Sequence, residues 1–240
     1  MTPLEPPAAD AIVVGDSRRA FALAQSLTVQ PRRSHQARGL WGYTGTSRAG
    51  LDLTVQSTGI GGPSAVAVIG DLVAAGVSTV VRLGTCVSLS KELKPGEVLL
   101  VERAIAADGA GRALAGQAAG PETVSGPVAV RPDRELFKSL IGLGRPATVS
   151  SHDLVARLDP GAAAFDSATE RTPVARDLQT AATLAVTRRL GIRGAALLIA
   201  IENGWSDRLT EAELEERFLD LGPAVLRVLE RSDPKVQVDG

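Results

Sequence analysis

The segment AALLIAI, residues Ala195–Ile201, is an uninterrupted apolar run that ends at two polar residues, Glu202 and Asn203. An apolar run of this length without alternating polar positions is typical of a central strand that is buried on both faces. Other runs of strand-like length and hydrophobicity lie at Ala11–Val14, Leu51–Gln56, Thr79–Leu83, Glu97–Glu102 and Ala147–Ser150. We therefore predict about six short strands.

Segments with helical signals alternate with these strands. The predicted helices cover Ser17–Leu27, Pro63–Ala75, Pro132–Gly142, Arg176–Leu190 and Thr210–Glu230. The first follows Asp16, a residue type that caps helix N-termini, and the last opens with a capping-box pattern. Two segments, Gly109–Gly126 and Asp159–Pro173, are predicted to be loops. The alternation of strands and helices favours an α/β sandwich with a mostly parallel or mixed sheet.

The composition and length exclude several classes of protein. Lys and Arg number 26 against 27 Asp and Glu, a net charge of −1, which argues against nucleic acid or an anionic membrane recognised by bulk charge. One cysteine, Cys86, and two histidines argue against a disulfide framework and a structural metal site. No apolar run reaches about 18 residues, so we expect no membrane span. We expect one domain over residues 1–240, with residues 1–10 flexible, in a reducing cytoplasm.

Glycine and charged residues follow the predicted strands, at the end where ligands bind in α/β sheets. Gly15 and Asp16 precede a helix, whose N-terminal N–H groups suit an anion, although this segment alone fits a simple tight turn better. Arg82 stands inside an apolar strand, where an arginine either pairs with a carboxylate or binds an anionic ligand. Glu202 is either a general acid or a strand-end residue that faces solvent or pairs with an arginine.

Four stretches, in this order and spacing, resemble the nucleoside phosphorylase family of the hexameric bacterial purine nucleoside phosphorylase and uridine phosphorylase type. They are GDSRR at Gly15–Arg19, RGLWGYTG at Arg38–Gly45, TGIGGPS at Thr58–Ser64 and VRLGT at Val81–Thr85. The resemblance runs from Ile12 to Val101. It implies a three-layer α/β/α sandwich with a mixed central sheet. It also implies that phosphate replaces the base of a nucleoside, which gives free base and ribose 1-phosphate without a metal or organic cofactor.

The resemblance assigns roles to individual residues. Phosphate would be held beside the anomeric carbon by Gly15, Arg19, Arg38, Arg82 and Thr85. Arg38 would come from a neighbouring subunit, which implies a homodimer or a trimer of dimers, a hexamer. Glu202 would protonate the departing base, assisted by Arg208 or Arg217. The nucleoside would contact Ile60, Cys86, Val155, Asp177, Leu178, Gln179 and Asn203.

The C-terminal half departs from the family's pattern. Asp177-Leu178-Gln179 stands where the family has Glu-Met-Glu, so Gln179 offers hydrogen bonds without charge, and Asp177 is expected to point elsewhere. Glu202 stands where Asp or Asn is usual, and residues 151–156 provide no aromatic ring for the base. Three interpretations stay open: a phosphorylase with an altered nucleoside, a nucleoside hydrolase of the same fold, and a catalytically impaired relative that binds phosphate or a phosphorylated ligand.

Three other features leave alternatives open. His152 lines the base pocket or lies in a surface loop, and Trp205 lies on a loop from which it could cover the base. Trp41 and Tyr43 are interpreted as core or interface anchors.

Overall fold

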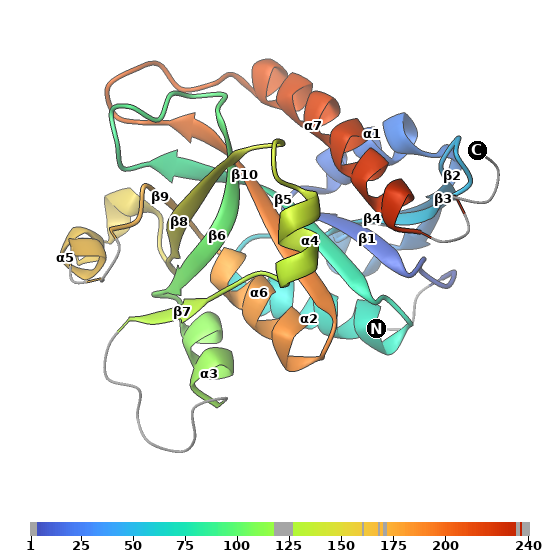
Figure 1. Ribbon diagram of the computed structural model, residues 1–240, viewed down its shortest axis with the longest axis horizontal. Coiled ribbons are helices and arrows are strands. Elements are labelled where there is room, and N and C mark those ends of the chain that lie inside the picture. Colours follow the sequence, from blue (N-terminus) through green and yellow to red (C-terminus); the bar gives the residue numbers. More distant parts are fainter. Residues whose placement is uncertain are drawn as a thin grey trace.

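The computed structural model of this chain describes residues 4–117, 127–159, 161–167, 169, 172–233 and 236. These residues form a ten-stranded mixed sheet with helices on both faces (Figure 1). One face is covered by α1 (Ser17–Leu27), α4 (Arg134–Ser139) and α7 (Glu211–Ser232). The other is covered by α2 (Gly62–Ala74), α3 (Gly109–Gln117) and α6 (Thr180–Arg189). The expected three-layer α/β/α sandwich with a mixed sheet is confirmed.

The strand order places the carboxyl ends of several strands side by side. The order is β10-β6-β8-β9-β5-β1-β4-β3-β2, with β7 paired to β6. β10 also pairs with β5, so β10, β6, β8, β9 and β5 close into a ring of paired strands. β1 runs parallel to both β4 and β5, and β5 runs parallel to β10. The side chains that follow these four strands therefore meet at one edge of the sheet.

The strands are β1 (Asp10–Val14), β2 (Val29–His35), β3 (Gly42–Thr46), β4 (Asp52–Ser57), β5 (Thr79–Ser88), β6 (Val98–Ala106), β7 (Val128–Val130), β8 (Arg145–Ser151), β9 (Ala175–Asp177) and β10 (Arg193–Glu202). The short elements η1 (Ala37–Gly39), η2 (Ala156–Leu158) and α5 (Ala162–Ser167) complete the described secondary structure.

The inner strands alternate between two apolar cores, as strands buried on both faces do. In β10, Leu197 and Ile199 belong to the core under α1 and α7, whereas Ala196 and Leu198 belong to the core under α6. All four side chains are fully buried. The run Ala195–Ile201 is thus the two-sided strand that its composition predicts.

Every predicted strand is present, and the structure adds β2, β3, β7 and β9. β2 contains Pro31, Arg32 and Arg33 and forms the sheet edge, where proline and charge are tolerated and an apolar face is not required. The helix predicted from Arg176 is wrong at its start, because Arg176 lies in β9 and α6 begins only at Thr180.

Two segments predicted as loops contain helices. α3 lies within Gly109–Gly126 and α5 lies within Asp159–Pro173, while residues 118–126, 160, 168, 170 and 171 are outside the described residues. The carboxylate of Asp108 accepts a 2.7 Å hydrogen bond from the Gly111 N–H at the start of α3. Because glycine and alanine give little amphipathic signal, the packing of α3 against α6 decides this helix.

The N-terminal segment and the aromatic residues also have defined positions. Of the N-terminus predicted to be flexible, residues 1–3 lie outside the described residues, and the Leu4 N–H donates to the Ser34 carbonyl at 2.8 Å. Tyr43 is buried against Phe21, with ring centroids 5.3 Å apart, which confirms a core anchor. Among the described helices, none has the length and hydrophobicity needed to cross a membrane.

The capping box of α7 provides a stability test. Thr210 Oγ1 accepts from the Glu213 N–H at 3.2 Å, and Glu213 Oε2 accepts from the Thr210 N–H at 2.8 Å. Because Thr210→Ala removes this cap, we expect the free energy of unfolding in urea to fall by about 1 kcal/mol. Glu216→Ala, at an exposed position of the same helix, is the matched control and should change it by less than about 0.5 kcal/mol. Equal effects of the two substitutions would contradict the capping role.

Candidate active site

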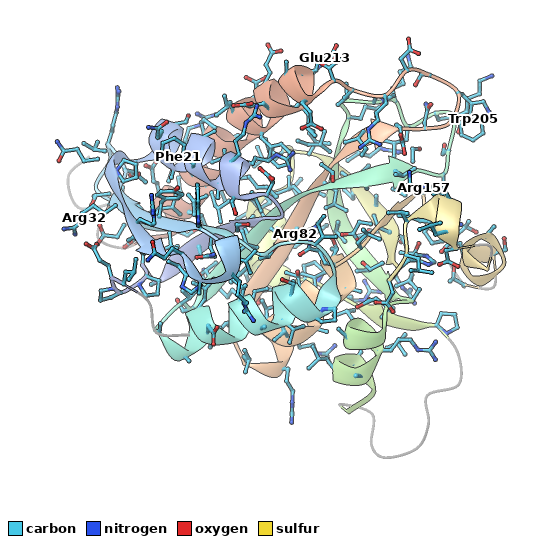
Figure 2. All side chains as sticks on the ribbon, turned by 180° about the vertical axis from the view of Figure 1, so that it is seen from behind. Phe21, Arg32, Arg82, Arg157, Trp205 and Glu213 are labelled. Carbon is cyan, nitrogen blue, oxygen red and sulfur yellow. The ribbon has the colours of Figure 1, made fainter. Side chains whose placement is uncertain are left out.

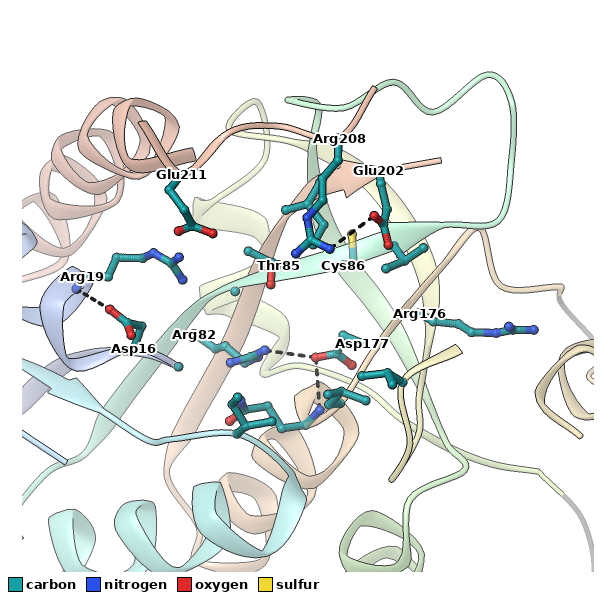
Figure 3. Close-up of a pocket in the computed structure, with 18 of the residues that line it drawn as sticks. Asp16, Arg19, Arg82, Thr85, Cys86, Arg176, Asp177, Glu202, Arg208 and Glu211 are labelled. Carbon is teal, nitrogen blue, oxygen red and sulfur yellow. Dashed lines mark hydrogen bonds and ion pairs between the residues drawn. The ribbon is translucent and has the colours of Figure 1, made fainter. Parts of the chain in front are cut away.

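A cavity of about 660 Å³ opens where the carboxyl ends of β1, β5, β9 and β10 meet (Figure 3). The fold brings most of the predicted site residues to its wall. Those that line it are Gly15, Arg19, Ile60, Arg82, Thr85, Cys86, Val155, Asp177, Leu178, Gln179, Glu202 and Arg208. Arg38, Asn203 and Arg217 do not line it in the single chain.

The first turn of α1 forms one end of the cavity. Asp16 caps this helix, since its carboxylate accepts a 2.9 Å hydrogen bond from the Arg19 N–H. The Arg19 guanidinium lies 4.3 Å from the ring centroid of Phe218, which fixes its place beside the cavity. Burial lowers the pKa of Arg19, while Asp16 and Glu211 oppose that shift. A helix N-terminus and a guanidinium side by side suit an anion.

Arg82 crosses the floor of the cavity and is 3% exposed. Its Nη2 donates to Asp177 Oδ2 at 3.1 Å and its Nε donates to Thr180 Oγ1 at 3.0 Å. Burial lowers the pKa of Arg82, and the Asp177 carboxylate opposes that shift. Of the two alternatives that the sequence left open, the structure shows the carboxylate pair. Nη1 is buried and has no hydrogen-bond partner among the described residues.

Gly84 makes this position of Arg82 possible. A Cβ at residue 84 would lie 2.5 Å from Arg82 Nη2 and 2.7 Å from Leu198 Cδ2. Any larger residue would therefore displace the guanidinium from the cavity floor.

Asp177 is the acceptor around which the floor is organised. Its side chain is 1% exposed, and its carboxylate accepts hydrogen bonds from the Ser151 and Thr180 hydroxyls and from the Gln179 and Thr180 N–H groups. The expectation that Asp177 points elsewhere is wrong. It assumed a helix or turn, whereas Asp177 ends β9, and its side chain turns toward Arg82 (Figure 3).

Gln179 joins the start of α6 to the glycine-rich loop after β4. Its Nε2 donates to the Gly59 carbonyl at 3.0 Å, and its Oε1 accepts from Thr58 Oγ1 at 3.0 Å. An amide has two N–H donors and two acceptor lone pairs, so each end keeps only one further hydrogen bond for a ligand.

The opposite wall carries the candidate acid. Glu202 ends β10, and its Oε2 accepts from Arg208 Nη1 at 3.4 Å. Arg217 instead lies beside the turn at Gly96, where a Cβ would be 3.3 Å from its Nε. Between the two arginines that the sequence could not separate, the structure therefore places Arg208 at Glu202.

Asn203 supports the loop after β10 and does not reach the cavity. Its Nδ2 donates to the Leu93 carbonyl at 3.3 Å, and its Oδ1 accepts from the Trp205 N–H and the Ser206 hydroxyl. Trp205 is 60% exposed and is not among the lining residues, so it does not cover the cavity in this structure.

The remaining wall is apolar, and none of the described residues that line it has an aromatic ring. It includes Ile60, Leu154, Val155 and Leu178. Cys86 is buried in it, and burial raises the pKa of its thiol, which disfavours the nucleophilic thiolate. Among the described residues, no group of three or more His, Cys, Asp or Glu side chains is placed to hold a metal ion.

The sequence did not indicate several charged residues of the cavity. Arg157 lies in η2 and belongs to no motif, and Glu211 and Glu215 are on α7, distant in sequence from the glycine-rich loops. Figure 2 shows Arg157 and Arg32 toward opposite ends of the molecule, with Arg82 between them. His152 is neither in the cavity nor in a surface loop, because it is 4% exposed and is not a lining residue.

Arg38 lies in η1, is exposed, and has the left-handed backbone conformation with φ 57°. Its contribution from a neighbouring subunit stays a prediction.

Comparison with known proteins identifies the family. The chain is 35% identical over 98 residues to a DeoD-type purine nucleoside phosphorylase of Oceanobacillus iheyensis, which is 40% of this chain and 41% of that protein. It is 33% identical over 106 residues to the DeoD-type enzyme of Clostridium novyi, which is 44% of this chain and 45% of that protein. The aligned region thus spans less than half the length of these curated relatives.

A solved structure extends the likeness of fold to nearly the whole chain. Purine nucleoside phosphorylase from Toxoplasma gondii, in complex with immucillin-H, superposes with a TM-score of 0.78 at 17% identity and covers 95% of this chain and 94% of that one. The family described as the phosphorylase superfamily matches residues 10–231. Because this match includes almost the entire fold and the whole cavity, the chain belongs to the phosphorylase superfamily.

Proposed function

We propose that this chain is a nucleoside phosphorylase that converts a nucleoside and phosphate into free base and ribose 1-phosphate. One observation carries the proposal: a single cavity has an anion-binding end at Gly15, Arg19 and Arg82 and a carboxylic acid, Glu202, on its opposite wall. The alignment with DeoD-type purine nucleoside phosphorylases supports the same activity.

Phosphate would occupy the end formed by α1 and β5. The buried Nη1 of Arg82 is costly without a partner, by about 1–3 kcal/mol, and a phosphate oxygen would satisfy it. The Arg19 guanidinium, the Gly15 N–H and the Thr85 side chain would hold the remaining oxygens. Fixing phosphate beside the sugar converts an encounter of two solutes into a reaction within one complex.

The bond between sugar and base would break between the two ends of the cavity. The bonding electrons leave with the base, a phosphate oxygen forms the new bond to the anomeric carbon, and Glu202 supplies a proton to the departing base. Arg208 would hold Glu202 in place through the hydrogen bond between them. No metal or organic cofactor takes part in this proposal.

A second candidate function follows from the charges around the phosphate end. Arg82 is balanced by Asp177, Arg18 pairs with Glu215 at 3.1 Å, and Glu211 faces Arg19. A dianion would therefore enter a region with little excess positive charge unless a neighbouring subunit adds Arg38. Water could then be the nucleophile, which would make the chain a nucleoside hydrolase. The uncharged Gln179 in the cavity wall supports a third candidate, a cavity that binds phosphate or a phosphorylated ligand without turnover.

The direct test is release of free base from purine and pyrimidine nucleosides, followed by chromatography with and without phosphate. We expect release that requires phosphate and produces one ribose 1-phosphate for each base. Glu202→Gln, which cannot donate the carboxylic proton, should lower kcat by about 100-fold or more while the fold is retained. Release without phosphate would establish the hydrolase, and phosphate binding without release from any nucleoside would establish the binding protein.

Arg19 tests the phosphate end alone. Because a hydrogen bond to a charged group contributes about 1.5–3 kcal/mol, Arg19→Gln should raise the KM for phosphate by about 10- to 100-fold. The KM for nucleoside should change much less. Arg48→Gln is the matched control, since Arg48 is exposed and does not line the cavity. An unchanged KM for phosphate in the Arg19 variant would place the phosphate elsewhere.

Asp177 tests the buried ion pair. Asp177→Asn leaves the Arg82 guanidinium without a compensating charge, so we expect the free energy of unfolding to fall by about 3–5 kcal/mol. Phosphate should then stabilise the variant more than it stabilises the natural chain, because it supplies the missing negative charge. The measurement is urea denaturation with and without phosphate, with the exposed Asp207→Asn as control. Equal stabilisation by phosphate in both chains would show that phosphate does not reach Arg82.

A further inference from the structure

A second charged cluster lies on the other side of β9 from the Arg82–Asp177 pair. Its centre is His152, the residue after β8, whose N–H donates to the Asp177 carbonyl at 3.0 Å. This main-chain hydrogen bond attaches residue 152 to the strand that carries the cavity floor. His152 is 4% exposed, and the reaction proposed above does not use it.

Both ring nitrogens of His152 face acidic side chains. Nδ1 lies 3.1 Å from Asp159 Oδ2, and Nε2 lies 3.4 Å from Asp166 Oδ1 and 3.1 Å from Ser150 Oγ. A neutral imidazole has only one N–H, so it can donate to only one of the two carboxylates. An imidazolium can donate to both. The positions of these atoms fit a protonated histidine that donates to both carboxylates.

The same contacts could suggest a Ser–His–Asp nucleophile, but burial excludes it. Ser150 is fully buried and does not line the cavity, so no substrate reaches its hydroxyl. The cluster is better explained by the neighbouring segment of chain, residues 153–159, that it holds in place.

Three charged side chains around His152 come from different parts of the chain. Asp159 follows η2, Asp166 lies in α5, and Arg176 lies in β9 and bonds to Asp166 through its Nε. Burial by itself would lower the pKa of His152, but the hydrogen bonds and charges of Asp166 and Asp159 outweigh it and raise the pKa, against a smaller opposing effect of Arg176.

Residues 153–159, here called the wall segment, connect this cluster to the cavity. Leu154, Val155 and Arg157 of the wall segment line the cavity. The segment is fixed at one end by Asp153, which accepts a 2.9 Å hydrogen bond from the Gly109 N–H, and at the other by the contact between Asp159 and His152. Removing the second contact frees one end of a short stretch that forms part of the cavity wall.

We propose that protonated His152 is a positioning residue that holds the wall segment against the cavity, and that the segment opens when His152 loses its proton. With His152 protonated, the cluster has two positive and two negative charges. With His152 neutral, one carboxylate loses its donor on the ring, and Arg176, which bonds to Asp166, is the only positive charge left among these four groups. A buried excess negative charge is unfavourable, so a carboxylate moves out, taking its segment with it.

The direction of the pH dependence follows from linkage. Because the pKa of His152 is raised in the closed structure, the stabilisation is complete below the ordinary pKa of 6.5 and is lost as the pH rises through the raised pKa. Each unit by which the pKa of His152 differs between the closed and open states corresponds to about a tenfold change in the equilibrium constant for opening. Opening should therefore increase toward alkaline pH.

Two measurements on the ligand-free chain test this proposal together. The chain has only two histidines, so NMR titration of the imidazoles gives two curves, which His35→Gln assigns. We expect His152 to titrate above 6.5, whereas burial lowers the pKa of His35. Hydrogen exchange of residues 153–159, measured by mass spectrometry between about pH 5.5 and 9 and corrected for intrinsic exchange, should show protection falling through the titration of His152.

The size of the change in hydrogen-exchange protection must agree with the pKa of His152 measured by NMR. Protection should fall by about tenfold for each unit by which His152 titrates above 6.5. His152→Gln, which is neutral at every pH, should have low protection in the wall segment and no step with pH, and His35→Gln should keep the step. If His152→Gln does not fold, Asp159→Asn takes its place and should lower the pKa of His152 and weaken the step.

The proposal is overturned if His152 titrates at or below 6.5, or if protection of the wall segment shows no step at its pKa. A purely structural role for His152 would lower protection in the variant but would give no such step in the natural chain. Neither measurement requires turnover, so failure of the phosphorylase assay would leave this test unaffected.

Discussion

The buried ion pair between Arg82 and Asp177 is the interaction on which the rest of the site depends. Two charges that are almost fully enclosed are tolerated only because they are close and because every other polar atom of the pair except Nη1 of Arg82 is hydrogen-bonded. Gly84 leaves room for the guanidinium, and Ser151 and Thr180 donate to the carboxylate. The pair therefore fixes β5, β8, β9 and α6 relative to one another and forms the floor of the cavity.

Strand β9 separates two charged environments because its side chains alternate between its two faces. Successive side chains point to opposite faces, so Asp177 turns to Arg82 while Arg176 points away from Asp177 (Figure 3). Arg176 bonds to Asp166, which belongs to the cluster of His152. Each side is close to neutral, yet each has one group whose charge state or remaining hydrogen bond can respond to its surroundings. On the cavity side it is Nη1 of Arg82, and on the other it is the imidazole of His152.

Local sequence features predicted the local structure well. The apolar run Ala195–Ile201 had to be buried on both faces, and the Asp16 and Thr210 caps set the starts of α1 and α7. These features succeed because the interactions involved are within a few residues of each other. β2 and α3 were missed because they do not depend on such local interactions. An edge strand with proline and arginine and a helix rich in glycine and alanine are stabilised by the elements that they pack against.

The sequence by itself determined the α/β fold, the edge of the sheet where the site lies, and the need of Arg82 for a negative partner. Only the tertiary structure decided which partner that is, because Asp177 is 95 residues away and no local pattern encodes a contact over that separation. It likewise placed Arg208 rather than Arg217 at Glu202 and brought two carboxylates to His152. Burial and long-range packing set these contacts, and both are properties of the folded chain as a whole.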